Sequence, residues 1–272
     1  MIDGSEQRSR GTGRESTQRS AAWRRLVAGP LVWRLSGVTY PTAVVATHGR
    51  YVGRDEYLRN CAAQMAALAA EFHSGDRVVE LGCGLGGNLI ALAPRISFGL
   101  GLDVNPWFLR HARRLAAHCQ APHIRFRTVP PDGRFAERAP FDVGLSIGVF
   151  ERLEASTVRA HVESLASHVR PGGRVLLYFL SSAARDLPMI DRLGPEAYVF
   201  WTESDAQTLV SGVTSLSVRS CRPWFGFGPP MGVAPAMLVI ADRRESRKSA
   251  AGFDPPHASV GPADPEHPRP AR

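Results

Sequence analysis

The sequence predicts an α/β protein in which a mostly parallel sheet carries helices on both faces. Two observations support this fold class. Apolar runs of strand length alternate with segments of helical spacing from about residue 77 to residue 241, and a glycine-rich turn leads from the first of these runs into the next helix. Because parallel strands need crossovers of about a dozen residues or more, such alternation is typical of a parallel sheet. The length of 272 residues is enough for one domain of this kind with extensions.

The first expected helix covers residues 55–72, where apolar side chains recur at helical spacing. Asp55 is expected to cap its start, and a serine and a glycine follow its end. The short apolar run 77–81 then predicts a strand. After a cluster of glycines, residues 87–93 predict a helix that stops before a proline.

The middle of the domain repeats this unit. Residues 96–104 are almost wholly apolar, which predicts a buried strand. Asn105 is expected to cap a helix that runs to about residue 118 and has a proline at its first position, where the missing N–H costs nothing. Residues 124–129 are expected to form the third strand.

The pattern after residue 140 predicts four more strands and two more helices. Residues 156–170 place valine, leucine and alanine side chains on one helix face, and the Pro-Gly-Gly turn at 171–173 is expected to end that helix. The strands are expected at 141–147, 174–180, 216–220 and 236–241, and the second helix at 203–213.

Both ends of the chain are expected to be disordered tails. Residues 1–25 are rich in arginine, serine and glycine without apolar periodicity, and residues 243–272 are rich in proline. Of the formal charge of +8, residues 1–25 hold +3 and residues 242–272 hold +1, which leaves +4 on the rest without a run of like charges. Nucleic acid is therefore not an expected partner.

Cysteine usage and hydropathy indicate a cytoplasmic protein. The four cysteines are scattered without a Cys-x-x-Cys pair, so we expect neither a metal centre nor a disulfide framework. No stretch approaches the roughly 20 uninterrupted apolar residues that a membrane-spanning helix needs. We therefore expect a reduced, cytoplasmic chain without a membrane partner.

The strongest signal is the glycine-rich turn at residues 79–88. Its glycines match both G-x-G-x-G and the dinucleotide pattern G-x-G-x-x-G, and N–H groups at the following helix start attract negative charge. Gly82 and Gly84 would let a ligand approach the main chain. Asp103 ends the second expected strand, 17 residues beyond Gly86, where a carboxylate can accept hydrogen bonds from both hydroxyls of a ribose. Together they predict a nucleotide-like ligand.

Four segments occur in an order that one protein family shares: 80–86 (Glu-Leu-Gly-Cys-Gly-Leu-Gly), 101–105 (Gly-Leu-Asp-Val-Asn), 140–153 and 169–175. In these segments the chain resembles the small-molecule type of class I S-adenosylmethionine-dependent methyltransferases. The resemblance implies S-adenosyl-L-methionine as cofactor and a Rossmann-like sheet of seven strands with an antiparallel last strand. It also implies a helical cap over 26–73 and a methyltransferase domain over 74–242 with an insert at 181–202.

The resemblance carries residue roles with it. The main chain around Gly82, Cys83 and Gly84 would hold the amino acid end of the cofactor, and Glu80 would order that loop. Asp103 would accept hydrogen bonds from the ribose hydroxyls.

The remaining cofactor contacts follow the other segments. Val104 would pack on adenine, and Ser146 and Ile147 would lie beside the methionine portion. Many relatives place an acid just after the third strand to receive the adenine amino group, but Pro130 stands there. Either Asp132 serves from a shifted loop, or a backbone carbonyl does.

No catalytic base is required by the resemblance, because methyl transfer is accelerated mainly by alignment and exclusion of water. Arg152 stands where many relatives carry a histidine. If the acceptor is a hydroxyl, His48 and Tyr51 in the cap are the candidates for a base, although His48 can equally be a surface histidine. The cap and the aromatic residues of the insert are expected to select the acceptor or to fill core.

The expected activity is methyl transfer to an oxygen, nitrogen or carbon nucleophile of a small metabolite by in-line displacement. Two alternatives stay open. An NAD(P)-dependent oxidoreductase is favoured by the overlapping dinucleotide pattern of glycines, and a non-catalytic nucleotide- or RNA-binding module could use the same fold. The identity of the acceptor and the oligomeric state cannot be read from the residues.

Overall fold

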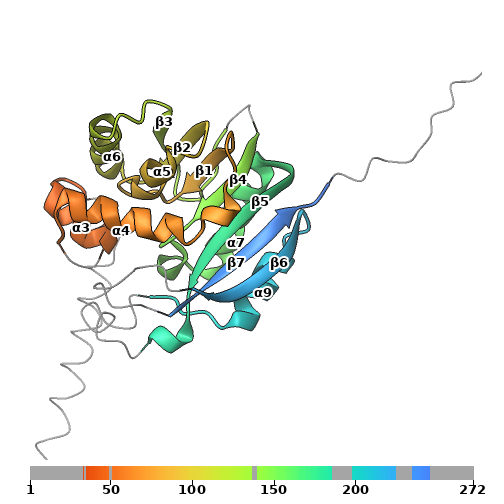
Figure 1. Cartoon of the computed structure of the whole chain (residues 1–272). Coiled ribbons are helices and arrows are strands. Elements are labelled where there is room, and N and C mark those ends of the chain that lie inside the picture. The colour runs from red at the N-terminus through yellow and green to blue at the C-terminus, as the bar shows by residue number, and fades with distance from the viewer. Residues whose placement is uncertain are drawn as a thin grey trace, which may run out of the picture.

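The computed structural model describes residues 33, 35–48, 51–136, 140–185, 198–224 and 235–245. These residues build one sheet of seven strands in the order β3-β2-β1-β4-β5-β7-β6 (Figure 1). The strands are β1 (Arg77–Leu81), β2 (Phe98–Asp103), β3 (Ile124–Thr128), β4 (Phe141–Ser146), β5 (Val169–Leu180), β6 (Leu216–Trp224) and β7 (Ala236–Arg243).

The pairing pattern confirms the expected sheet. The pairs β1–β2, β1–β4, β2–β3 and β4–β5 are parallel, whereas β7 runs antiparallel to both β5 and β6. The last strand is therefore inserted antiparallel between two strands of the opposite direction. Because strand order reverses between β1 and β4, the helices that follow these two strands lie on opposite faces of the sheet, and ligands bind at such a point in open α/β sheets.

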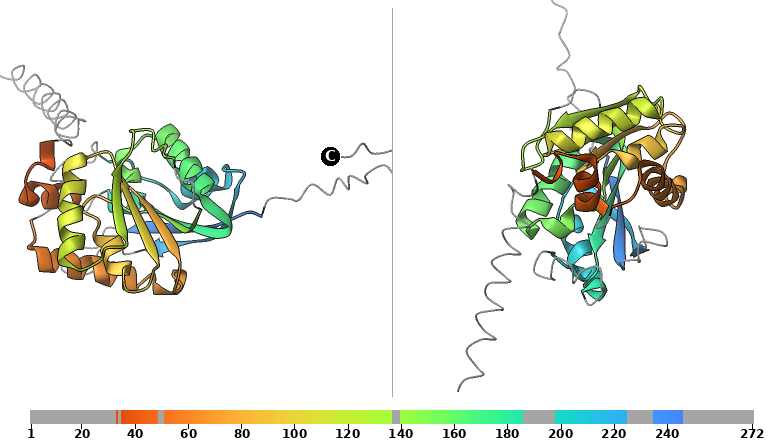
Figure 2. Two further views of the ribbon diagram at one scale, coloured as in Figure 1. Left: turned by 90° about the horizontal axis from the view of Figure 1, so that it is seen from above. Right: turned by 90° about the vertical axis from the view of Figure 1, so that its left-hand side faces the viewer.

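Helices cover both faces of the sheet. One hydrophobic cluster packs α3 to α6 against one face, and a second packs α7 and α9 against the other. Figure 2 shows α4 and α7 on opposite sides of the strands, with α3 beyond one end of them. The helices are α3 (Tyr40–His48), α4 (Arg54–Ala66), α5 (Gly87–Leu92), α6 (Pro106–His118), α7 (Ala155–His168) and α9 (Glu203–Ser211).

The Asn105 cap is confirmed, but two other boundaries differ from the expectation. Asn105 accepts a hydrogen bond from the Trp107 N–H. The helix expected over 55–72 ends at Ala66, and a separate 3₁₀ helix covers Ala69–Glu71. Its N-cap is Gly53, not Asp55, which lies in the first turn where an acid favours the helix dipole.

The Pro-Gly-Gly turn also behaves differently. α7 ends at His168, and β5 already begins at Val169 rather than at residue 174. The register of β5 on β4 jumps, because Phe141 pairs with Val169 while Val143 pairs with Arg174. The turn is thus a bulge inside the strand, since a step of two residues along β4 corresponds to a step of five residues along β5.

The tail at 1–25 lies outside the described residues, as do 246–272 of the other tail and 186–197 of the insert. In the described part, no helix is long and apolar enough to cross a membrane. The four cysteines form no disulfide with one another, and Cys61 and Cys83 are buried. No group of side chains in these residues has the composition of a metal site.

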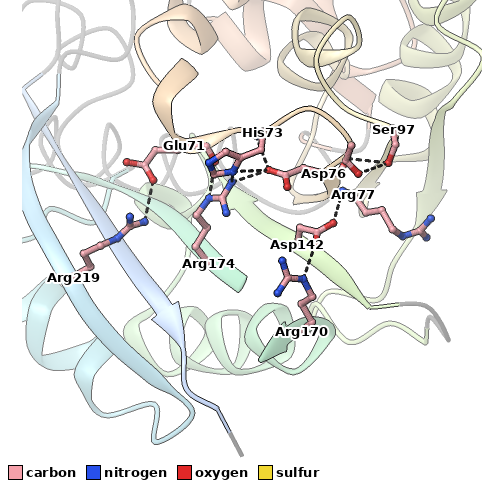
Figure 3. A network of polar contacts seen from close by, with 10 residues as sticks. Glu71, His73, Asp76, Arg77, Ser97, Asp142, Arg170, Arg174 and Arg219 are labelled. Carbon is pink, nitrogen blue, oxygen red and sulfur yellow. Dashed lines mark hydrogen bonds and ion pairs between the residues drawn. The ribbon is translucent and has the colours of Figure 1, made fainter. Parts of the chain in front are cut away.

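Ion pairs and hydrogen bonds connect neighbouring segments at the amino end of the sheet (Figure 3). Arg174 on β5 donates to the Asp76 carboxylate at 2.7 Å and to the Glu71 carbonyl at 2.6 Å. Asp142 on β4 accepts from the Arg77 N–H at 2.7 Å and from the Arg170 guanidinium at 2.6 Å. These contacts tie the segment before β1 to the middle of the sheet.

Candidate functional site

The glycine turn lies at the carboxyl end of β1, and its geometry explains why glycine is needed. Gly82, Gly84 and Gly86 have φ values of +77°, +51° and +75°, which L side chains rarely adopt. The N–H groups of Gly82 and Cys83 both donate to the Leu102 carbonyl, at 2.7 and 3.0 Å. The turn is therefore fastened to β2 beside the end of that strand.

Asp103 is the acid that ends β2, and its carboxyl group reaches back to the turn. One oxygen accepts the Gly84 N–H at 2.9 Å and the other accepts the Asn105 N–H at 2.8 Å. Burial raises the pKa of Asp103 to about 6, although these N–H groups counteract it. Each carboxylate oxygen can accept a second hydrogen bond, so two donors from a ligand could still be bound.

Glu80 on β1 is a second buried carboxyl group below the turn. Its Oε1 atom accepts from the Asn88 side-chain amide at 2.7 Å, which links β1 to α5. Burial raises the pKa of Glu80 to about 8. The Oε2 atom of Glu80 and the Oδ1 atom of Asn88 are buried and have no hydrogen-bond partner among the described residues. Two polar atoms are thus left for water or a ligand.

Other side chains occupy part of the space around the turn. A Cβ on Gly82 would collide with the Val149 side chain, and a Cβ on Gly86 would collide with the Phe126 ring. At these two positions, glycine makes room for side chains of the protein itself, and the approach of a ligand to the main chain at Gly82 stays a prediction. A Cβ on Gly84 would lie 3.2 Å from the Thr47 methyl group, so α3 covers the turn at this point.

The remaining cofactor residues expected from the sequence lie at different distances from the turn. Ser146 is buried at the end of β4 and donates to the Leu81 carbonyl at 3.0 Å, and Ile147 is buried next to it. Val104 is 40% exposed. Asp132 is exposed and accepts from the Arg134 N–H at 3.0 Å.

Asp132 makes no contact with Asp103 in the structure. Its charge acts instead on His161 of α7. The sequence expectation that Asp132 receives the adenine amino group stays a prediction, as does the alternative of a backbone carbonyl.

The two candidate catalytic bases of the cap, His48 and Tyr51, are described only in part. His48 is the last residue of α3, and its side chain lies outside the described part of the structure. Tyr51 is described and is 56% exposed. The segment between them lies outside the described residues, so their roles stay predictions.

Two neighbours at the end of β4 were not assigned roles from the sequence. The Oε2 atom of Glu151 is buried without a hydrogen-bond partner in the described residues, and burial raises the pKa of Glu151. The Arg152 guanidinium stacks on the Tyr198 ring, 4.4 Å from its centroid. Glu151 lies in the segment 140–153 that carries part of the family resemblance, but no sequence signal shows that its carboxyl group is buried.

These residues fit the cofactor that the sequence implies. The buried carboxyl group of Asp103 can accept further hydrogen bonds. A Cβ on Gly84 would meet only the Thr47 side chain, and Ile147 is an apolar residue at the end of β4. Such a site suits a ribose diol attached to a planar base and a short chain.

Comparison with known proteins points the same way. Residues 79–175 match the sequence model of a family described as a methyltransferase domain. No curated protein matches the chain.

Solved structures show where this fold recurs. The N-methyltransferase NodS from Bradyrhizobium japonicum WM9, in complex with S-adenosyl-L-homocysteine, superposes with a TM-score of 0.57 at 15% identity, over 79% of this chain and 98% of that chain. Magnesium protoporphyrin IX methyltransferase (ChlM) from Synechocystis PCC 6803, with bound S-adenosylhomocysteine, gives 0.54 at 17% identity over 82% and 99%. The S-adenosylmethionine-dependent methyltransferase SibL gives 0.53 at 20% identity over 69% and 55%.

Proposed function

We propose that this chain, which carries a class I S-adenosylmethionine-dependent methyltransferase domain, moves a methyl group to an oxygen, nitrogen or carbon nucleophile of a small metabolite. The observation that carries the proposal is Asp103. Its buried carboxyl group stands at the end of β2, bonded to the glycine turn through the Gly84 N–H and still able to accept two hydroxyl groups.

The bound cofactor supplies a sulfonium methyl group, which is already a strong electrophile. The protein then has to align the acceptor and exclude water. Asp103 and the turn at 82–84 fix the adenosine end and the amino acid end, and Ser146 and Ile147 at the end of β4 border the space between them. Val104 contributes an apolar surface for the adenine ring.

Proton removal is needed only if the acceptor is not already a free nucleophile. His48 and Tyr51 remain the candidates for that step, because His48 ends α3 and Tyr51 follows it closely in sequence, and Thr47 of the same helix lies beside the glycine turn. Replacing them in turn, His48→Gln and Tyr51→Phe, should lower the rate of methyl transfer while leaving cofactor affinity unchanged.

Calorimetry with S-adenosylhomocysteine tests the cofactor assignment. We expect binding to the native protein, and weak or no binding to NAD under the same conditions. Folded protein that gives no heat with S-adenosylhomocysteine at millimolar concentration would contradict the assignment, and stabilisation by NAD instead would favour an oxidoreductase. A screen of small hydroxyl, amine and carboxylic acid compounds with labelled methyl donor then tests the acceptor class.

A further inference from the structure

We propose that the methyl acceptor carries an anionic group, a carboxylate or a phosphate, and that Arg152 and Arg185 bind this group beside the rings of Tyr198 and Phe200. This inference rests on the proposed function, because it names the substrate class of the same site. It is carried by the placement of two guanidinium groups that have aromatic neighbours and, in the described ranges of the chain, no carboxylate partner.

The two arginines follow neighbouring strands of the sheet at their carboxyl ends. Arg152 ends the 3₁₀ helix Phe150–Arg152 that follows β4, and Val149, just before this helix, packs on Gly82 of the turn. Arg185 follows the 3₁₀ helix Ser182–Ala184, which comes directly after β5. β4 lies next to β1, and β5 lies one strand further from the turn.

Backbone contacts hold the aromatic segment against these strand ends. The Val199 N–H donates to the Glu151 carbonyl at 2.8 Å, and the Trp201 N–H donates to the Leu180 carbonyl at 2.9 Å. The rings of Tyr198 and Phe200 are 6.2 Å apart. The segment 198–201 therefore bridges the ends of β4 and β5 and presents two neighbouring rings there.

Stacking holds the Arg152 guanidinium in place without using up its donors. Its central carbon lies 4.4 Å from the Tyr198 centroid and 6.0 Å from that of Trp33, and one N–H makes a long contact of 3.5 Å with the Tyr198 hydroxyl. A guanidinium that stacks by its face keeps the N–H groups of its edge in the plane, where they match the two oxygens of a carboxylate or phosphate.

Arg185 repeats this arrangement on the neighbouring ring. Its guanidinium lies 5.1 Å from the centroid of Phe200, and the side chain is exposed. Two cations thus flank one aromatic pair from two different loops. A planar acceptor could stack on the rings while its anionic group contacts the arginines.

Neither arginine is neutralised by an acid in the part of the chain that the structure describes. The arginines of the amino end behave otherwise, since Arg170, Arg174 and Arg219 each form an ion pair with an aspartate or glutamate. Glu151 is the sequence neighbour of Arg152. Burial raises the pKa of Glu151 by more than the charge of Arg152 lowers it, and the two side chains form no ion pair. Within the described residues, no acid therefore competes with a ligand for these two guanidinium groups.

An anionic group at this position could also be the carboxylate of the cofactor's amino acid end. The two sources share the same chemistry, and the cofactor can be tested by itself. S-adenosylhomocysteine carries that carboxylate and 5′-methylthioadenosine lacks the whole amino acid end. If Arg152 served the cofactor, its loss would weaken only the first of these two ligands.

The experiment uses the full chain saturated with S-adenosylhomocysteine and three fluorinated probes, 4-fluorobenzoate, 4-fluorophenyl phosphate and neutral 4-fluorobenzamide. Because fragments of this size bind at about millimolar affinity, ¹⁹F NMR line broadening is the readout. We expect at least one anion to bind and the amide to bind about tenfold more weakly. Arg152→Gln and Arg185→Gln should each weaken the anion about tenfold and leave the amide unchanged.

Matched variants separate this result from a loss of structure. Arg110 on α6 stacks on Trp107 at 5.8 Å, so Arg110→Gln removes a similar contact elsewhere and should leave anion binding unchanged. Arg152→Lys keeps the charge and should retain part of the affinity. Equal binding of anions and amide, or no anion binding while S-adenosylhomocysteine still binds, would overturn the inference. Loss of S-adenosylhomocysteine affinity in Arg152→Gln with unchanged 5′-methylthioadenosine affinity would assign Arg152 to the cofactor.

Discussion

The two ends of the sheet use the same residue types in opposite ways. At the amino end, burial alone would raise the pKa of Asp142, but the Arg77 N–H and the Arg170 guanidinium hold it below its ordinary value. At the carboxyl end, the pKa of Asp103 is raised to about 6 and that of Glu80 to about 8, because burial outweighs the hydrogen bonds that these groups accept.

The arginines follow the same division. Arg174 contacts a carboxylate, a carbonyl and a histidine ring, whereas the described neighbours of Arg152 and Arg185 include aromatic rings and no acid in an ion pair with them. Paired charges contribute to folding, and unpaired buried acceptors and donors cost free energy unless a ligand or water completes them. The comparison supports the proposal that the carboxyl end binds a ligand, whereas the contacts of the amino end join parts of the fold to one another.

The largest effect is expected at the amino end. Arg174→Ala removes one partner of an ion pair in which the side chains are only 11% and 10% exposed, and so leaves the Asp76 carboxylate buried without its cation. Breaking such a pair costs about 3–5 kcal/mol of unfolding free energy, which urea denaturation would measure.

The control is Arg170→Ala at the same end of the sheet. Arg170 is 48% exposed, and exposed ion pairs contribute about 0–1 kcal/mol. Neither variant should change the affinity of the folded protein for S-adenosylhomocysteine. Equal losses of stability in the two variants would show that burial does not distinguish the two ion pairs. Weakened cofactor binding would show that the amino end of the sheet affects binding at the carboxyl end.

A second prediction tests the carboxyl end. Asp103→Asn should weaken S-adenosylhomocysteine about 100-fold, or about 2.7 kcal/mol, because an amide cannot accept from the N–H groups of both Gly84 and Asn105 and also take ribose hydroxyls. Calorimetry measures the affinity. Asp142→Asn makes the same change at the amino end, where it should lower stability and leave affinity unchanged. Similar affinities of the native protein, Asp103→Asn and Asp142→Asn for S-adenosylhomocysteine would mean that Asp103 does not bind this ligand.

The sequence predicts most of the sheet because its strands are nearly continuous apolar runs in a regular order. β1 occupies the expected residues 77–81, and the caps and turns around it follow from glycine, asparagine and proline. Boundaries were missed where local composition does not change. Residues 67–70 are as apolar as the helix before them, so the end of α4 at Ala66 has no local signal.

The site was predictable where backbone conformation requires a residue type. Positive φ angles require glycine at 82, 84 and 86, and this requirement is visible in the sequence. The stacking of Arg152 on Tyr198 joins residues 46 positions apart, and the contact of Thr47 with Gly84 joins different elements. Such contacts depend on the tertiary fold, and no spacing in the sequence indicates them.

The third prediction concerns pH. Ribose hydroxyls donate to the carboxylate form of Asp103, and the pKa of this group in the free protein is raised to about 6. Affinity for S-adenosylhomocysteine should therefore be constant above pH 6 and fall by up to about tenfold for each pH unit below it, because binding must then release a proton.

Calorimetry between pH 5 and 7.5 tests this dependence in buffers of different ionisation enthalpy, which reveal the released proton. The ligand's own carboxylate and amine titrate outside this range. Asp103→Asn should show no such dependence. A native protein whose affinity rises as the pH falls below 6 would mean that the ligand prefers protonated Asp103.

The smallest effect is expected where α3 covers the turn. Gly84→Ala should cost about 1–2 kcal/mol of stability, since Gly84 has a φ of +51° and the new methyl group would lie 3.2 Å from that of Thr47. Gly75→Ala is the matched control, because Gly75 has a φ of +93° and open space around it, so that this variant reports backbone strain without a contact.

A double-mutant cycle with Thr47→Ser separates the contact from the strain, because serine removes only the methyl group. If α3 covers the turn, Thr47→Ser should recover part of the loss in Gly84→Ala and none of the loss in Gly75→Ala. Full additivity of Thr47→Ser with both glycine variants would mean that α3 stands away from Gly84. In that case the turn at the carboxyl end would be open on this side, and a helical cap would not be what excludes water from the methyl group.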